Sequence, residues 1–146
     1  MKAKIETQIQ IFAPIENVWD VLSDFESYPL WSEFIKQFDG IPEVGRRTKV
    51  HLEAPESMKI VMNPVFLVIA EQEEIRWKGK LVIPGIFDGE HYFKLEASGP
   101  NQTKLTQGEN FSGILIPFLK KMINVNTKQG FNTFNNAIKK RVEDLL

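Results

Sequence analysis

The sequence contains no cysteine, which excludes disulfide bonds and cysteine-based zinc sites. Its only histidines, His51 and His91, are far apart in the chain and lack the close spacing of a paired-histidine metal site. A site that joined carboxylates to one histidine is the remaining alternative. We therefore expect neither a metal centre nor a cofactor in this chain.

The sequence also lacks a surplus of charge of either sign. Lysine and arginine total 18, aspartate and glutamate total 19, and the net charge is −1. A protein that binds the phosphate backbone of a nucleic acid needs a basic surplus to displace its counterions. We therefore expect no nucleic-acid partner.

Long hydrophobic runs are missing as well. A transmembrane helix needs roughly 18 or more consecutive apolar residues, and no window of this sequence approaches that length. Residues 1–12 alternate polar and apolar side chains, a pattern typical of a strand and not of a secretory signal. These features predict a cytoplasmic protein without stable insertion in a membrane.

Several sequence signatures of enzymes are absent. The chain contains no GxSxG, no P-loop, no GxGxxG and no HExxH motif. Ser112 stands between Phe111 and Gly113, without the surroundings of a nucleophile elbow. Covalent catalysis by a serine is therefore not expected.

The composition that remains is that of an ordinary globular domain. The chain has 146 residues, of which 42% are hydrophobic and 25% are charged. Ile5, Thr7, Ile9 and Ile11 alternate with polar residues, which indicates a half-buried strand. No linker, repeat or low-complexity tract interrupts the sequence. We therefore predict one α+β domain that covers residues 1–146.

The order of the predicted elements is a strand, two short helices, a run of strands and a long helix. Pro14 suits the first turn of a helix that continues to about Asp24. Pro64 interrupts one strand and indicates an edge or a bulge there. We expect a second helix at 27–35, a loop at 36–46, strands at 47–54, 58–70, 73–81, 89–97 and 103–111, and a final helix whose apolar stripe is Phe131, Phe134, Ile138, Val142 and Leu145.

Two segments resemble the superfamily of polyketide cyclases, dehydrases and START-like lipid-transport domains. Residues 13–31 match an opening of the form APxExVWxVLxDFxxYPxW, and residues 108–113, GENFSG, precede an apolar stretch and the long helix. The resemblance covers essentially the whole chain. It implies the helix-grip fold, in which a curved antiparallel sheet wraps around the C-terminal helix and leaves an internal cavity. A shared fold does not decide the chemistry.

The inward face of the predicted hairpin carries a polar pair. If the turn is centred on Pro100, His91 faces Glu109 directly across the two strands. A buried imidazole and a buried carboxylate need each other or a ligand as partners. The pair is either a structural contact or a general acid–base couple, and a register slip of one residue would turn His91 outward.

These observations leave three hypotheses for function. The first is a domain that binds a hydrophobic or aromatic small molecule, such as a lipid or a polyketide-like compound, in the cavity. The second is a cyclase- or dehydrase-type enzyme that uses His91 and Glu109, and the third is a protein-interaction module whose partner is unknown. The apolar loop 83–88 is expected either to gate the cavity or to pack against the core. The candidate ligand-binding residues are Trp31, Phe34, Trp77, His91, Phe93, Gln107, Glu109, Phe111, Phe118, Met122, Phe131 and Phe134.

Overall fold

The computed structural model describes residues 1–54, 58–80, 85 and 87–146. Of the predicted apolar loop 83–88, residues 83, 84 and 86 therefore lie outside the described residues. The elements follow in the order β1 (Lys2–Ile11), α1 (Ile15–Leu22), a 3₁₀ turn (Phe25–Ser27), α2 (Tyr28–Trp31), β2 (Ile35–Phe38), β3 (Val50–Ala54), β4 (Met58–Met62), β5 (Val65–Ala70), β6 (Glu74–Lys80), β7 (Asp88–Gly99), β8 (Gln102–Ser112), α3 (Ile116–Lys121), a π-helical segment (Met122–Thr127) and α4 (Lys128–Asp144).

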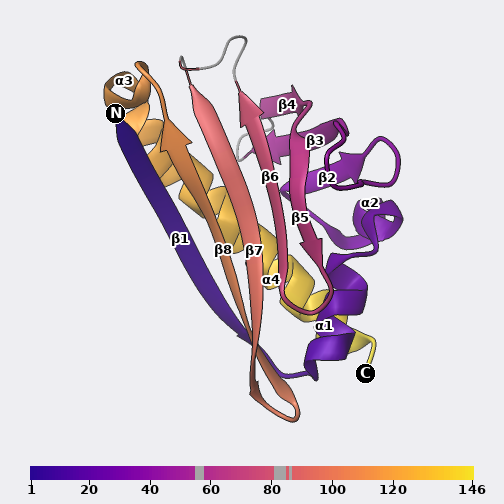
Figure 1. Cartoon of the computed structure of the whole chain (residues 1–146). Coiled ribbons are helices and arrows are strands. Elements are labelled where there is room, and N and C mark those ends of the chain that lie inside the picture. Colours follow the sequence, from indigo (N-terminus) through magenta and orange to yellow (C-terminus); the bar gives the residue numbers. More distant parts are fainter. Residues whose placement is uncertain (55–57, 81–84, 86) are drawn as a thin grey trace.

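A curved sheet of five antiparallel strands grips the C-terminal helix. Its strand order is β1-β8-β7-β6-β5, and α4 lies along its inner face (Figure 1). Four residues of the predicted apolar stripe explain this packing, because Phe131, Phe134, Ile138 and Val142 are buried. The fifth, Leu145, was wrongly placed in the stripe: it follows the end of α4 and is 58% exposed. The α+β helix-grip fold is confirmed.

A second, smaller sheet differs from the prediction. It contains β2, β3 and β4, so the expected loop at 36–46 overlaps a strand. The expected helix at 27–35 ends early because Ser32 is extended, with φ −80° and ψ 134°. The expected strand at 58–70 is split between the two sheets at the position of Pro64, which has no N–H for a strand ladder.

The register of the central hairpin matches the prediction. Leu95 pairs with Leu105, Phe93 with Gln107, and His91 with Glu109. The single irregularity in this pairing falls between Ala97 and Gly99, next to the turn, so it does not affect the inward face farther along the strands.

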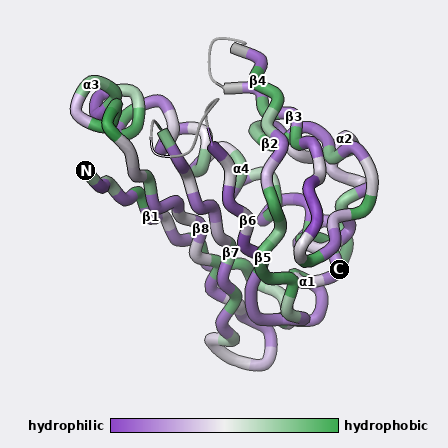
Figure 2. The backbone as a smooth tube through the Cα atoms, turned by 45° about the horizontal axis from the view of Figure 1, so that its top comes forward, coloured by the Kyte–Doolittle hydropathy of each residue, from purple (hydrophilic) through white to green (hydrophobic). Residues whose placement is uncertain are grey.

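The segment before α4 is less regular than one long helix. α3 runs into the π-helical segment, and this segment runs into α4 without a break. The N-terminus, α3, β4 and the distal ends of β7 and β8 all lie at one end of the molecule, which we call the α3 end (Figure 1). Figure 2 shows hydrophobic stretches in α3 and β4 at this end. Within the described part of the chain, no helix combines the length and the hydropathy needed to cross a membrane.

Candidate functional site

His91 and Glu109 meet on the inner face of the sheet. Strands β7 and β8 present them as direct partners, and the distance from His91 Nδ1 to Glu109 Oε1 is 3.3 Å. Only 4% of His91 and 9% of Glu109 is exposed. The predicted imidazole–carboxylate pair therefore exists and lies inside the domain.

Aromatic side chains fill the space around the imidazole ring. The His91 ring stacks on Trp77, with centroids 4.7 Å apart and planes 23° apart. Phe131 and Phe93 approach it to 4.8 and 4.9 Å, and Phe93 in turn packs on Phe134 at 5.2 Å. These four aromatic residues, which the sequence placed in the ligand site, form a packed core in this structure.

A chain of buried polar groups extends from the other nitrogen of His91. The distance from His91 Nε2 to Gln107 Oε1 is 2.9 Å, and Gln107 Nε2 donates to Asn135 Oδ1 at 2.8 Å. Asn135 Nδ2 then donates to Thr7 Oγ1 at 2.8 Å. Gln107 is fully buried, Asn135 is 2% exposed and Thr7 is 6% exposed, so the chain is shielded from water.

Sequence reasoning missed Asn135 and the role of Thr7. Both left a signal, because Thr7 alternates with inward isoleucines and Asn135 lies four residues after Phe131 in the apolar stripe. A polar residue on a buried face needs a hydrogen-bond partner. The sequence did not show which groups Thr7 and Asn135 hydrogen-bond, because the partners of each residue lie on other elements.

The carboxylate of Glu109 reaches the edge of this packed region. A Cβ on Gly89 would overlap Glu109 Oε2, so the carboxylate occupies the space left by the missing side chain. About a tenth of the Glu109 side chain is exposed, 11% against 5% for His91. Glu109 is therefore the more exposed member of the pair.

Partly exposed apolar side chains lie at the α3 end beyond Glu109. Phe87 is partly exposed and stacks on the buried Phe111, with centroids 5.5 Å apart and planes 3° apart. On the small sheet, exposure increases toward the tip, from none at Val50 to an intermediate value at Leu52 and 41% at its pairing partner Ile60. On α3, Leu119 is half-buried against the core. The α3 end thus exposes apolar surface that the packed middle does not.

The other residues predicted to bind the ligand do not lie together in one site. Phe118 is 82% exposed, and Met122 is 38% exposed, so neither is part of the packed interior. Phe34 lies against Phe131 at 5.8 Å. Trp31 borders a surface hollow of about 570 Å³ between α2 and α4.

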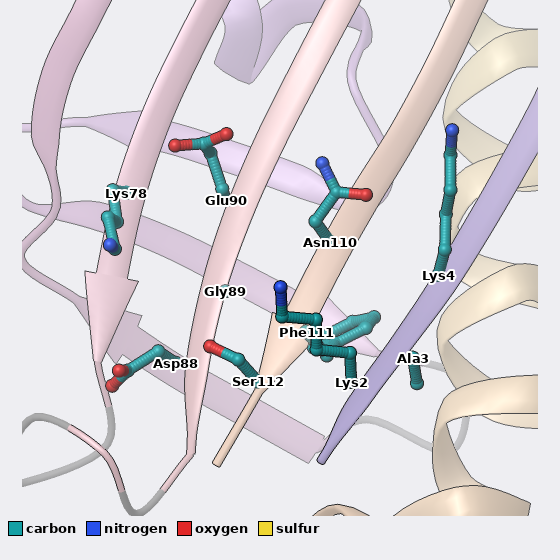
Figure 3. A pocket seen from close by; sticks show the side chains of 10 residues that line it. All are labelled: Lys2, Ala3, Lys4, Lys78, Asp88, Gly89, Glu90, Asn110, Phe111 and Ser112. Carbon is teal, nitrogen blue, oxygen red and sulfur yellow. The ribbon is translucent and has the colours of Figure 1, made fainter.

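A second hollow lies on the outer face of the sheet. Its volume is about 550 Å³, and a row of polar side chains from four neighbouring strands borders it (Figure 3). Lys78, Glu90, Asn110 and Lys4 are consecutive cross-strand partners in this row. Because these side chains lie on the opposite face from His91 and Glu109, the hollow is separate from the candidate site.

The described residues contain no group of three or more histidine, aspartate or glutamate side chains placed to hold a metal ion. The candidate site itself has one histidine and one carboxylate. An imidazole and a carboxylate in contact can share or exchange a proton.

Comparison with solved structures shows the same architecture in proteins of different sequence. A START superfamily protein from Mycobacterium smegmatis is 21% identical, with a TM-score of 0.76, and the match covers 98% of this chain and 99% of that one. The Zhui aromatase/cyclase from a Streptomyces species is 13% identical, with a TM-score of 0.79 and coverage of 98% and 94%. Norcoclaurine synthase from Thalictrum flavum, solved in complex with dopamine and hydroxybenzaldehyde, is 14% identical, with a TM-score of 0.75 and coverage of 99% and 88%.

A comparison with curated protein sequences gives no significant match. The likenesses to solved structures are below 25% identity and establish the fold alone. The family comparison goes further, because residues 2–143 match the family described as polyketide cyclase / dehydrase and lipid transport. With nearly the whole chain matched and the helix-grip fold present, this protein belongs to the polyketide cyclase / dehydrase and lipid transport family.

Proposed function

We propose that this domain binds a hydrophobic, ring-containing small molecule at its α3 end, with Glu109 at the inner limit of the site. The aromatic rings packed around His91 fill the middle of the interior. The proposal therefore moves the ligand from the centre of the domain, where the sequence placed it, to the end where apolar side chains are partly exposed.

The observation that carries this proposal is the exposure of Glu109. Its side chain points inward from β8, next to a histidine that is almost completely buried, and 11% of it is still accessible. An inward-facing carboxylate that contacts solvent requires a path from the surface. A ligand that follows this path meets a carboxylate at the inner end.

The apolar side chains of the α3 end suit an apolar ligand. Leu52, Phe87 and Leu119 pack against the core and remain partly exposed. Covering such surface contributes roughly 25 cal/mol per Å² of apolar area removed from water. A ring compound fits this setting, and one structural relative was solved with dopamine and hydroxybenzaldehyde.

Binding of a neutral hydrophobic dye such as Nile red tests the proposal. Leu119 and Phe118 are neighbours in α3, but Leu119 packs on the core and Phe118 is 82% exposed. We expect Leu119→Gln to weaken dye binding about tenfold, a loss of about 1.4 kcal/mol. The matched control Phe118→Gln should bind the dye as the wild type does.

Two results would contradict the proposal. One is the absence of saturable dye binding by the wild-type domain. The other is an equal loss in both variants, which would place the dye on the exposed surface of α3. Thermal unfolding of each variant in the absence of dye separates a loss of binding from a loss of folded protein.

Proton-transfer catalysis at the same place is the second candidate, and the contact between His91 Nδ1 and Glu109 Oε1 favours it. We expect Glu109→Gln to retain dye binding, since the amide keeps the shape of the side chain. If a panel of aromatic aldehydes and phenols reveals turnover, the same variant should lower kcat by about a hundredfold or more. Turnover that is unchanged in Glu109→Gln would remove Glu109 from the reaction.

A further inference from the structure

The buried hydrogen-bond chain behind His91 has a single possible direction. Gln107 Nε2 lies 3.2 Å from the main-chain oxygen of Phe131, and a carbonyl oxygen can only accept a hydrogen bond. The group that faces it must therefore be the NH₂ of Gln107. The same NH₂ also donates to Asn135 Oδ1, and the oxygen of the Gln107 amide is left to face His91.

The far end of the chain is fixed in the same way. The hydroxyl of Thr7 donates to the main-chain oxygen of Gln107 at 3.1 Å, and that oxygen is again only an acceptor. With its proton used there, Thr7 Oγ1 accepts from Asn135 Nδ2. Main-chain carbonyls thus orient both amides, and neither amide can flip without placing two acceptors or two donors face to face.

This direction decides which nitrogen of His91 carries hydrogen. Since Gln107 Oε1 is an acceptor, His91 Nε2 must be a donor. In a neutral imidazole with hydrogen on Nε2, the lone pair of Nδ1 would face Glu109 Oε1 at 3.3 Å. Two acceptors would then face each other in a region of low dielectric, which is unfavourable.

Among the described residues, the groups around the pair include no other one that could relieve this conflict. Trp77 from β6, Phe131 from α4 and Phe93 from β7 pack their rings against the imidazole, and none of the three side chains titrates. From β8, Gln107 and Glu109 face it. Among these groups only Glu109 can exchange a proton, and the stacked Trp77 ring favours a cation over a neutral imidazole.

We propose that the Thr7–Asn135–Gln107 chain fixes hydrogen on His91 Nε2 and thereby makes the His91–Glu109 couple hold one additional proton between Nδ1 and Oε1. Thr7, Asn135 and Gln107 are positioning residues in this arrangement. The additional proton turns the conflict of two acceptors into a charge-assisted hydrogen bond. The proton is thus stored next to Glu109, the more exposed member of the pair.

The stored proton gives the couple a defined use if the proposed ligand site exists. A ligand oxygen, from a carbonyl or a hydroxyl group, that contacts Glu109 can accept this proton. The couple is then left as a neutral imidazole and a carboxylate, and water returns the proton after the ligand leaves. The couple would therefore act first as a general acid toward a bound ligand. This role deepens the proposed function, and it depends on that function only for the presence of the ligand.

Nuclear magnetic resonance of the imidazole nitrogens tests the stored proton without any ligand. The chain has only two histidines, and His51→Asn assigns the signals of His91. At neutral pH we expect hydrogen on His91 Nε2, together with either a protonated Nδ1 or a protonated Glu109 carboxyl group in the carbon spectrum. In Glu109→Gln we expect Nδ1 without a proton in either case, while hydrogen stays on Nε2.

Two further variants distinguish the effect of the buried hydrogen-bond chain from the effect of the Glu109 carboxylate. Gly89→Ala should displace the Glu109 carboxylate and release the stored proton, whereas Gly99→Ala, whose Cβ would have no neighbour within 4 Å, should not. Adding Gln107→Met to Glu109→Gln should remove the acceptor at Nε2 and allow the other tautomer to appear. A purely structural chain would change stability and leave the tautomer unchanged.

The proposal is overturned if wild-type His91 carries its hydrogen on Nδ1 alone, or if Nδ1 is bare while Glu109 is ionised. If Nδ1 is protonated in the wild type, the proposal is equally overturned when Glu109→Gln leaves that nitrogen protonated. A failure of dye binding with the expected spectrum would refute the ligand site and leave the stored proton intact, so the two proposals can fail separately.

Discussion

Asn135 and Asn136 are neighbours in α4 with opposite surroundings. Asn135 is 2% exposed and connects Gln107 to Thr7, whereas Asn136 is exposed. We expect Asn135→Ala to lower the free energy of unfolding by about 2 kcal/mol, because two buried polar groups lose a partner. Asn136→Ala should change it by less than about 0.5 kcal/mol.

Urea denaturation of the two variants measures this difference directly. Equal effects in both would show that the buried chain contributes nothing beyond the helix. The contrast between two identical residues one position apart illustrates that the role of a residue depends on the elements it contacts, which its identity does not reveal.

At the scale of elements, a glycine in α4 allows the helix to pack closely against the ring of Phe34. A Cβ on Gly130 would lie 2.6 Å from the ring of Phe34. Alanine is the better helix former by about 1 kcal/mol, but the steric conflict with a buried ring costs about 1–3 kcal/mol. We therefore expect Gly130→Ala to destabilise the protein, whereas Gln129→Ala at the exposed neighbouring position should not.

A double variant gives the control for this packing. Phe34→Leu removes the ring that the new methyl group would meet, so the cost of Gly130→Ala should fall when the two changes are combined. Thermal unfolding of the single and double variants provides the comparison. Strictly additive effects would show that the contact between Phe34 and α4 is not the cause.

The C-terminal end of α4 is held by a carboxylate. Lys139 Nζ lies 2.5 Å from Glu143 Oε2, and the main-chain N–H of Phe12 donates to the same oxygen at 2.9 Å. The hydrogen bond from Lys139, followed by that from Phe12, lowers the pKa of Glu143 below its ordinary value of 4.5, against the opposing effect of burial. Glu143 therefore links the helix to the end of β1.

This link should weaken in acid. A carboxylate whose pKa is lower in the folded chain contributes stability above its unfolded pKa and loses it as the pH falls through the folded value. We expect Glu143→Gln to cost about 1 kcal/mol at neutral pH and to approach the wild type below the ordinary pKa of glutamate. Urea denaturation across this pH range measures the difference, and a constant gap at all pH values would contradict the role of ionisation. Asp144→Asn, which alters an exposed pair with Lys140, is the matched control.

At the scale of the whole molecule, the two sheets share one hydrophobic core. Buried residues of β2 and β3, including Phe38 and Val50, belong to the same cluster as those of the large sheet and α4. We expect a single cooperative unfolding transition, as the predicted single domain requires. Tryptophan fluorescence reports on α1, α2 and β6, where Trp19, Trp31 and Trp77 lie, and circular dichroism reports on all elements.

Coincident transitions in the two signals would support one domain. An early transition confined to part of the signal would show that the small sheet unfolds separately. The protein-interaction hypothesis also belongs to this scale, and it stays a prediction. Ile114, Phe118 and Val125 expose apolar surface near the α3 end, but the described residues give no indication of a partner.

The sequence by itself determined the features that depend on local pattern. Alternation along β7 and β8 and the position of Pro100 predicted the pairing of His91 with Glu109. The three- and four-residue spacing predicted α4, and residues 13–31 indicated the family. The strand pairing and the helix follow from periods of two and 3.6 residues, which short stretches of sequence carry in full, whereas the family was indicated by resemblance to a specific motif.

Only the tertiary structure decided which inward-facing side chains pack on one another and which remain accessible. Alternation places Trp77, His91 and Glu109 on one face, but it does not show that rings seal His91 while Glu109 keeps contact with solvent. The connection of Thr7 to Asn135 joins groups 128 positions apart. Such contacts arise when distant elements come together, so the stored proton that they imply could be inferred only from the folded chain.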